Sequence, residues 1–350
     1  MRFGMFNYNQ GRWGASQTEL FDDLLAQIVL AEELGLEECW FTEHHFSDYS
    51  LLPSPNLVIA AAAQRTARMR FGNLVNVLPF HSPLRLAEET ATLDQLSHGR
   101  IGFGVGRGIR RDEFERLQLP LAEAPAMFEE ALSVVVKAWT EDHWSHEGRY
   151  WRYHDISLRP APYQRPHPPI YVGANSTESV LWVAEHGYNL ANHLSTLALA
   201  QDNVERYRAH YRGARPGEFV LAREIVIAES DAAARAAGQR AMQSFWHLFA
   251  QHALAPPAPP SDERLAEYTR HFRYLGERTH AALEADGIII TGAPDTVARR
   301  LREACATIRP DVLLGVFSFG GLSHAEVCRS LRLFAREVVP ALRDVPAAPR

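Results

Sequence analysis

The chain has 350 residues, of which 46% are hydrophobic and 22% charged, and a formal net charge of -6. This composition is typical of an ordinary globular protein with a large core, and without a basic excess it argues against nucleic acid and anionic membranes as partners. Three widely spaced cysteines with no CxxC pair exclude a disulfide framework and a cysteine metal site, and the longest apolar run, 57–63, is too short to span a bilayer, so we expect a cytoplasmic protein.

Short apolar runs alternate with longer amphipathic stretches, which predicts repeated strand and helix units around a parallel sheet. Eight strands are predicted from β-branched and aromatic residues, at 2–8, 37–42, 70–78, 100–106, 169–173, 188–192, 219–228 and 312–319. Apolar residues at helical spacing predict helices near 20–34, 55–66, 83–96, 124–139, from 176 onward, 197–211 and 325–338.

Eight such units in series predict a closed (β/α)8 TIM barrel, because an open doubly wound sheet has fewer strands and starts with a GxGxxG turn that this chain lacks. We therefore expect one domain over residues 1–350, with a long irregular insertion at 141–169. A second insertion, 255–286, opens with a proline-rich run that cannot lie inside a helix. We expect it to form a mobile lid, and its composition fits a plain surface insertion equally well.

The segment Phe41-Thr42-Glu43-His44-His45-Phe46 lies where the second predicted strand ends. Catalytic groups of barrel enzymes come from such strand ends, so Glu43, His44 and His45 are candidates for proton transfer near neutral pH. Adjacent residues of an extended chain point to opposite faces, so only one imidazole should face the mouth. Two alternatives stay open: the histidines cap the strand, or they serve a metal-dependent hydrolase, which the adjacent spacing disfavours. We expect no metal.

Two further strand ends have the composition of a phosphate site. Alternate glycines in 102–108 thin one face of the fourth strand, so that a flat ligand or another backbone can approach, and Arg107 follows as a phosphate-binding cation. After the fifth strand, Asn175 and Ser176 begin a helix whose free N–H groups favour an anion. The alternatives are glycines that only relieve crowding in the barrel and an ordinary N-terminal cap.

Several segments together form a family pattern: Phe3-Gly4 with Phe6, Glu43-His44-His45-Phe46, Val77-Leu78-Pro79, Pro83 to Glu88, Leu93 to Arg100, Gly106-Arg107-Gly108, and a terminal pattern near Gly292 and Phe334. In this combination the chain resembles the bacterial luciferase-like flavin-dependent monooxygenases nearly from end to end. That resemblance implies the TIM-barrel fold and FMN, in its reduced form, as the cofactor.

The resemblance also implies roles for single residues. His44 would be the catalytic imidazole, and Arg107 with the helix start would hold the FMN phosphate. The pair Leu74–Val75 would be a non-proline cis peptide under the flavin ring. The full set of cofactor-binding residues that the resemblance implies is Phe6, Leu74, Val75, Asn76, Gly106, Arg107, Asn175, Ser176 and Ser179.

The activity implied by the resemblance is a two-component monooxygenase. Reduced FMN from a separate NAD(P)H:flavin reductase would react with O2 to give a C4a-peroxyflavin, which oxygenates a small lipophilic or carbonyl-containing organic substrate. The alanine-rich helix near 57–63 indicates a dimer, either homodimer or heterodimer. An F420-dependent hydride-transfer enzyme and a flavin-binding protein without catalysis are the alternatives.

The sequence also departs from the luciferase pattern. Asn175 stands where luciferase-type chains have a glutamate, Gly106 stands where the luciferase subunit has a reactive cysteine, and residues 192–194 differ. The resemblance therefore implies neither an aldehyde substrate nor light emission.

Overall fold

Eight parallel strands close into a barrel in the computed structural model, which describes residues 1–253, 270, 271 and 273–346. The hydrogen-bonded order is β10-β12-β1-β2-β3-β5-β8-β9, and β9 pairs back to β10. All eight strands predicted from the sequence are present, so the predicted barrel is confirmed. Their bounds are β1 (Arg2–Asn7), β2 (Glu38–Phe41), β3 (Arg70–Asn73), β5 (Ile101–Gly106), β8 (Ile170–Gly173), β9 (Asn189–Asn192), β10 (Phe219–Ile227) and β12 (Val312–Val316).

Amphipathic helices pack around this barrel and bury their apolar faces against it. The first shows how the sequence sets the bounds: Ser16 and Glu19 form a capping box at its start, and Gly35 with φ 87° follows its end. The helices around the barrel include α1 (Gln17–Glu33), α2 (Pro55–Ala63), α3 (Pro83–Leu96), α5 (Ala124–Thr140), α6 (Thr177–Glu185), α7 (Leu197–His210), α11 (Pro294–Ile308) and α12 (His324–Leu333).

The third predicted strand, 70–78, is interrupted. β3 ends at Asn73, the Leu74–Val75 peptide bond is cis, and the chain continues as β4 (Asn76–Val77) and a 3-10 turn, η1 (Leu78–Phe80). The non-proline cis bond implied by the resemblance is therefore confirmed. It places Leu74 and Val75 at the carboxyl end of the barrel.

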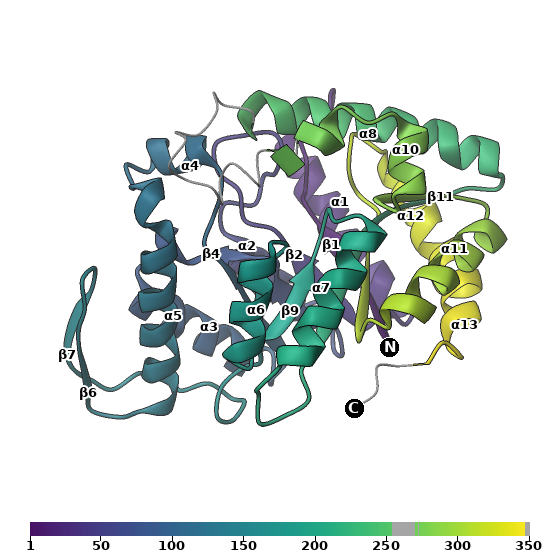
Figure 1. Cartoon of the computed structure of the whole chain (residues 1–350). Coiled ribbons are helices and arrows are strands. Elements are labelled where there is room, and N and C mark those ends of the chain that lie inside the picture. The colour runs from purple at the N-terminus through teal and green to yellow at the C-terminus, as the bar shows by residue number, and fades with distance from the viewer. Residues whose placement is uncertain (254–269, 272, 347–350) are drawn as a thin grey trace.

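The expectation of an irregular insertion at 141–169 was wrong in part, because β6 (Trp144–Glu147) and β7 (Arg152–Ile156) form an antiparallel hairpin that projects from the barrel in Figure 1. A further parallel strand, β11 (Ile289–Gly292), was not predicted and pairs with the carboxyl half of β10. The remaining elements include α4 (Arg111–Arg116), η2 (Leu121–Glu123), α8 (Asp231–Ala253), α10 (His280–Ala285), η3 (Phe334–Val338) and α13 (Val339–Leu342).

The carboxyl ends of the strands form the mouth of the barrel, and α4 and α8 lie at this end (Figure 1). Of the predicted lid at 255–286, residues 255–269 and 272 lie outside the described residues, and the described remainder contains α10. Among the described helices, none combines the length and apolar character that crossing a membrane requires.

Candidate active site

A cavity of about 290 Å³ opens at the carboxyl ends of the barrel strands. The ends of β1, β2, β5, β8 and β9 contribute to its walls, as expected where a rigid sheet aims its loops at one mouth. Two of the predicted site residues, His45 and Asn76, are not among its lining residues. The others line it together: Phe6, Glu43, His44, Leu74, Val75, Gly106, Arg107, Asn175, Ser176 and Ser179.

The groups predicted to bind phosphate lie at the ends of two neighbouring strands, β5 and β8. Arg107 follows β5 directly, and Ser176 is the N-cap of α6, where its Oγ accepts a hydrogen bond from the Ser179 amide. The two serine hydroxyls are 2.9 Å apart. A helix start presents unpaired N–H groups and partial positive charge, so the cap and an anion site coexist here.

Asn175 links this anion site to the neighbouring strand. Its Nδ2 donates to the backbone oxygen of His193 at 2.9 Å, which ties the end of β8 to the end of β9. Within the described part of the chain its Oδ1 is buried and has no hydrogen-bond partner. The asparagine thus lines the cavity with one unused acceptor.

The alternate glycines of β5 make room for the chain itself. A Cβ on Gly104 would lie 1.5 Å from the Asn73 backbone oxygen, and one on Gly106 would lie 2.6 Å from Val75 Cγ2. Gly173 is the counterpart on β8, where a Cβ would lie 2.8 Å from Val75 Cγ1. Gly104 leaves room for the close approach of another backbone segment. Gly106 and Gly173 leave room for the Val75 side chain, which is an apolar part of the cavity wall.

His44 is hydrogen-bonded to a carboxylate that the sequence analysis did not identify. His44 Nδ1 lies 3.0 Å from Oε1 of Glu113 in α4, and the same oxygen accepts the backbone N–H of His45 at 2.9 Å. Burial works to raise the pKa of Glu113, but His44 and Arg110 hold the pKa below its ordinary value. An ionised carboxylate on Nδ1 fixes the proton there and leaves Nε2 of His44 for the cavity.

Glu43 is a buried anchor for the segments around it. Its Oε1 accepts from Nε2 of His45 at 3.0 Å and of His81 at 2.8 Å, and its Oε2 accepts the Val77 N–H at 2.8 Å. Burial works to raise the pKa of Glu43, but His81, His45 and the Val77 amide hold it below its ordinary value. Glu43 therefore positions the chain on both sides of the site, and His45 is turned toward it.

A second histidine lines the same cavity and is backed by a buried carboxylate, and the sequence analysis missed both. His193 directly follows β9, and its Nε2 lies 2.9 Å from Oε1 of Glu224 in β10. The hydroxyl of Tyr8, just beyond β1, lies 3.0 Å from the same nitrogen. No cluster of three or more His, Cys, Asp or Glu side chains in the described residues is arranged to hold a metal ion.

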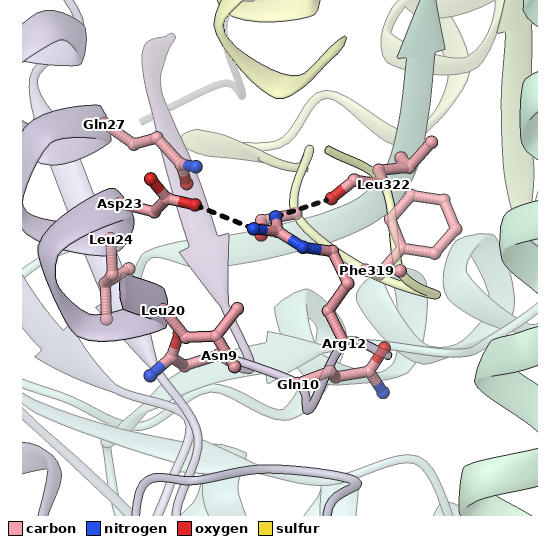
Figure 2. Close-up of a pocket in the computed structure, with 11 residues that line it drawn as sticks. Asn9, Gln10, Arg12, Leu20, Asp23, Leu24, Gln27, Phe319 and Leu322 are labelled. Carbon is pink, nitrogen blue, oxygen red and sulfur yellow. Dashed lines mark hydrogen bonds and ion pairs between the residues drawn. The ribbon is translucent and has the colours of Figure 1, made fainter. Parts of the chain in front are cut away.

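A smaller pocket of about 20 Å³ lies between the loops that follow β1 and β12. Figure 2 shows Arg12 between its two partners, the Asp23 carboxylate at 3.2 Å and the Leu322 backbone oxygen at 3.5 Å. This pocket shares no lining residue with the main cavity and has room for about one water molecule. Its size excludes an organic ligand.

Comparisons with known proteins agree with this geometry. The family model described as luciferase-like monooxygenase matches residues 1–308. The oxygenase component of flavin-dependent trigonelline monooxygenase from Acinetobacter baylyi is 28% identical over 363 residues, covering 98% of this chain and 96% of that protein.

Two solved structures share the whole fold. Monooxygenase RslO1 from Streptomyces bottropensis superposes with a TM-score of 0.84 and 26% identity, over 97% of this chain and 99% of that one. The oxygenating constituent of 3,6-diketocamphane monooxygenase from Pseudomonas putida, a type II Baeyer-Villiger enzyme in complex with FMN, gives a TM-score of 0.81 at 22% identity, over 100% and 99% of the two chains.

Proposed function

Because the chain belongs to the luciferase-like monooxygenase family, we propose that it is the oxygenase component of a two-component monooxygenase that uses reduced FMN and O2. One observation carries the proposal: a single cavity holds both a phosphate-type anion site and an imidazole–carboxylate pair. When bound there, reduced FMN supplies the electrons that activate O2 for transfer to an organic substrate.

The residues present fit FMN. Arg107 can make charge-assisted hydrogen bonds to the phosphate, and Ser176 and Ser179 add hydroxyls at the start of α6. Leu74 and Val75 give the cavity an apolar wall suited to a flat ring. The cavity thus has a polar end for the phosphate and an apolar wall for the ring.

His44 is proposed to manage protons in the cavity. With Nδ1–H held by Glu113, Nε2 can accept a proton from a reacting group or return one. Glu113 keeps the imidazole oriented, and Glu43, the residue before His44, is anchored by the Val77 N–H. Positioned acid–base groups of this kind typically contribute about 10² to 10⁴ fold to a rate.

The family membership also supports a proposal for the reductase and the substrate with which the protein works. We propose that a separate NAD(P)H:flavin reductase supplies the cofactor, that the substrate is a small organic compound and that the enzyme is cytoplasmic. We further propose a dimer, either homodimer or heterodimer, because Leu57 of α2 and Leu96 of α3 are 70% and 48% exposed on adjacent helices. A monomer at micromolar concentration in light scattering contradicts the dimer.

One experiment distinguishes this function from the two alternatives, an F420-dependent hydride-transfer enzyme and a flavin-binding protein without catalysis. Purified protein is titrated without oxygen with photoreduced FMN and with reduced F420, then exposed to O2 with small lipophilic and carbonyl compounds, and O2 consumption and products are measured. We expect FMN binding and O2-dependent product. Oxidation of reduced F420 without O2 consumption would instead identify a hydride-transfer enzyme. FMN binding without turnover of any compound would identify a flavin-binding protein without catalysis.

A variant of His44 and a matched control variant test whether His44 takes part in product formation. His44→Ala should bind FMN as the parent does and lose most product formation. His210→Ala, at the exposed end of α7, should leave both unchanged.

A further inference from the structure

The pair His193–Glu224 lies across the barrel from the pair His44–Glu113. In the ring of eight strands, β2 and β9 are four strands apart in either direction, so residues that directly follow them stand on opposite sides of the mouth. The His193 side chain is 13% exposed and lines the cavity, while Glu224 beneath it is 1% exposed. The cavity therefore has an imidazole backed by a carboxylate on each of two facing walls.

The contacts of His193 determine which nitrogen is available. Glu224 Oε1 lies 2.9 Å from Nε2, so this nitrogen carries the proton. The Tyr8 hydroxyl lies 3.0 Å from Nε2 and 3.2 Å from Nδ1. The N–H or lone pair of each ring nitrogen points outward in the plane of the ring, and these two directions diverge. A hydroxyl almost equally distant from both nitrogens therefore cannot lie along either direction. The in-plane lone pair of Nδ1 is therefore an unused acceptor among the described residues.

Glu224 gives this imidazole a reason to take a proton. Its Oε2 is buried and has no hydrogen-bond partner within the described part of the chain, so the carboxylate is only half satisfied. A protonated His193 would complete an ion pair with it. The other titratable or charged groups around the cavity include Tyr8, Tyr49 and His271, and His44, Arg110 and Glu113 on the facing wall, with Arg223 beside Glu224 on β10.

The walls beside His193 are aromatic. The Phe6 ring meets the His193 ring edge to face at 4.9 Å, the Tyr8 and Tyr49 rings are 5.3 Å apart, and Phe249 lines the same cavity. Such surfaces favour a planar ring over an alkyl chain. A hydrogen-bond acceptor on the wall also requires a donor on the ligand, which an aldehyde lacks.

We propose that His193 contacts the substrate and that the substrate is an aromatic compound carrying a hydroxyl group, whose O–H donates to Nδ1. Transfer of that proton breaks the O–H bond, forms N–H at Nδ1, and leaves an aryloxide facing an imidazolium that Glu224 stabilises. His193 is thus a catalytic residue, and Glu224 and Tyr8 position it. The inference rests on the proposed function in taking this cavity as the substrate site, and it adds the substrate class.

The test uses 4-nitrophenol as the probe, because its anion is coloured and its neutral form is not. Protein loaded with oxidised FMN is titrated with the probe at a pH where the free probe is mostly neutral, and 4-nitroanisole serves as the matched ligand without an O–H. His193→Gln keeps a polar side chain that cannot take the proton, and His193→Phe removes the acceptor. His210→Gln is the control, and FMN binding with thermal unfolding shows that each variant is folded.

We expect the parent and the control to bind the probe as its anion, and His193→Gln to bind it in the neutral form. His193→Phe should bind it about fivefold to tenfold more weakly, the loss of one hydrogen bond, and should no longer prefer it to 4-nitroanisole. The inference is overturned if the parent binds the probe in its neutral form or not at all, or if His193→Gln binds the anion as the parent does. Failure to bind FMN would count against the proposed function alone, because the probe can be titrated into the protein without FMN.

Discussion

Replacing Glu113 by glutamine tests the assignment of His44 most sharply. The variant keeps the size of a side chain that is 2% exposed, and it keeps one oxygen to accept a hydrogen bond, but it removes the charge that faces His44 Nδ1 at 3.0 Å. The glutamine oxygen would have to accept from both His44 and the backbone N–H of His45, as Oε1 does in the parent, but without the negative charge. The imidazole should lose its fixed orientation.

The size of the effect follows from these contacts. Hydrogen bonds to a charged group contribute about 1.5 to 3 kcal/mol and neutral ones about 0.5 to 1.5, so Glu113→Gln should lower the free energy of unfolding by about 1 to 2 kcal/mol at pH 7. Product formation should fall about 10²-fold, within the range of an acid–base contribution. FMN affinity should stay nearly unchanged, because Arg107 follows β5 and Ser176 caps α6, whereas Glu113 belongs to α4 and faces His44.

The pH dependence provides an internal check on this prediction. Since the folded-state pKa of Glu113 is lowered, its contribution to stability is present above the ordinary carboxyl pKa and is lost as the pH falls through the folded value. The stability difference between parent and variant should therefore shrink in acid, as measured by urea unfolding at several pH values.

Glu115→Gln is the matched control for this prediction. It lies on the same helix, where its ion pair is with Arg111 at the surface, and should change neither stability nor rate beyond about 0.5 kcal/mol. A Glu113→Gln protein that oxygenates at the parent rate while losing stability would refute the role given to the His44–Glu113 pair.

Three more predictions follow from single contacts. Arg107→Ala should weaken FMN binding by about 10-fold or more, measured by flavin fluorescence, while riboflavin binding changes little because it has no phosphate. Gly104→Ala should fold poorly or unfold at a clearly lower temperature, because its Cβ would lie 1.5 Å from the Asn73 oxygen. Burial works to lower the pKa of His81, but Glu43 raises it above its ordinary value. The contribution of His81 to stability is therefore fully present below the ordinary histidine pKa and is lost as the pH rises through the folded pKa. His81→Gln should therefore flatten the fall in unfolding free energy on the alkaline side of neutrality, as measured by urea unfolding.

Much of the fold follows from the alternation of apolar runs and helical stretches, which predicted every strand of the closed barrel. The sequence analysis failed where the local pattern is short or interrupted. The β6–β7 hairpin is partly exposed and lacks the buried apolar run by which the strands were identified. β11 does overlap such a run, Ile288 to Ile290, but the strand has only four residues and lies outside the ring of eight. The cis peptide bond between β3 and β4 was predicted from the family resemblance alone, because hydrophobic periodicity does not reveal a cis peptide.

The candidate site residues were predictable where they lie at or just beyond the end of a strand. His44, Arg107 and Ser176 each follow a strand or cap the next helix, so position alone singled them out. Their carboxylate partners were not predictable, because Glu113 is 69 residues from His44 and Glu224 is 31 residues from His193. Glu224 moreover occurs inside a strand read only as apolar, and only closure of the barrel brings it beneath His193.

A crystal structure of the protein with bound FMN tests the central claim most directly. The account predicts the phosphate within hydrogen-bond distance of Arg107 and Ser176, and the ring against Leu74 and Val75 with its reactive edge toward His44. FMN bound with its phosphate away from Arg107, or with its ring out of reach of His44, would contradict it.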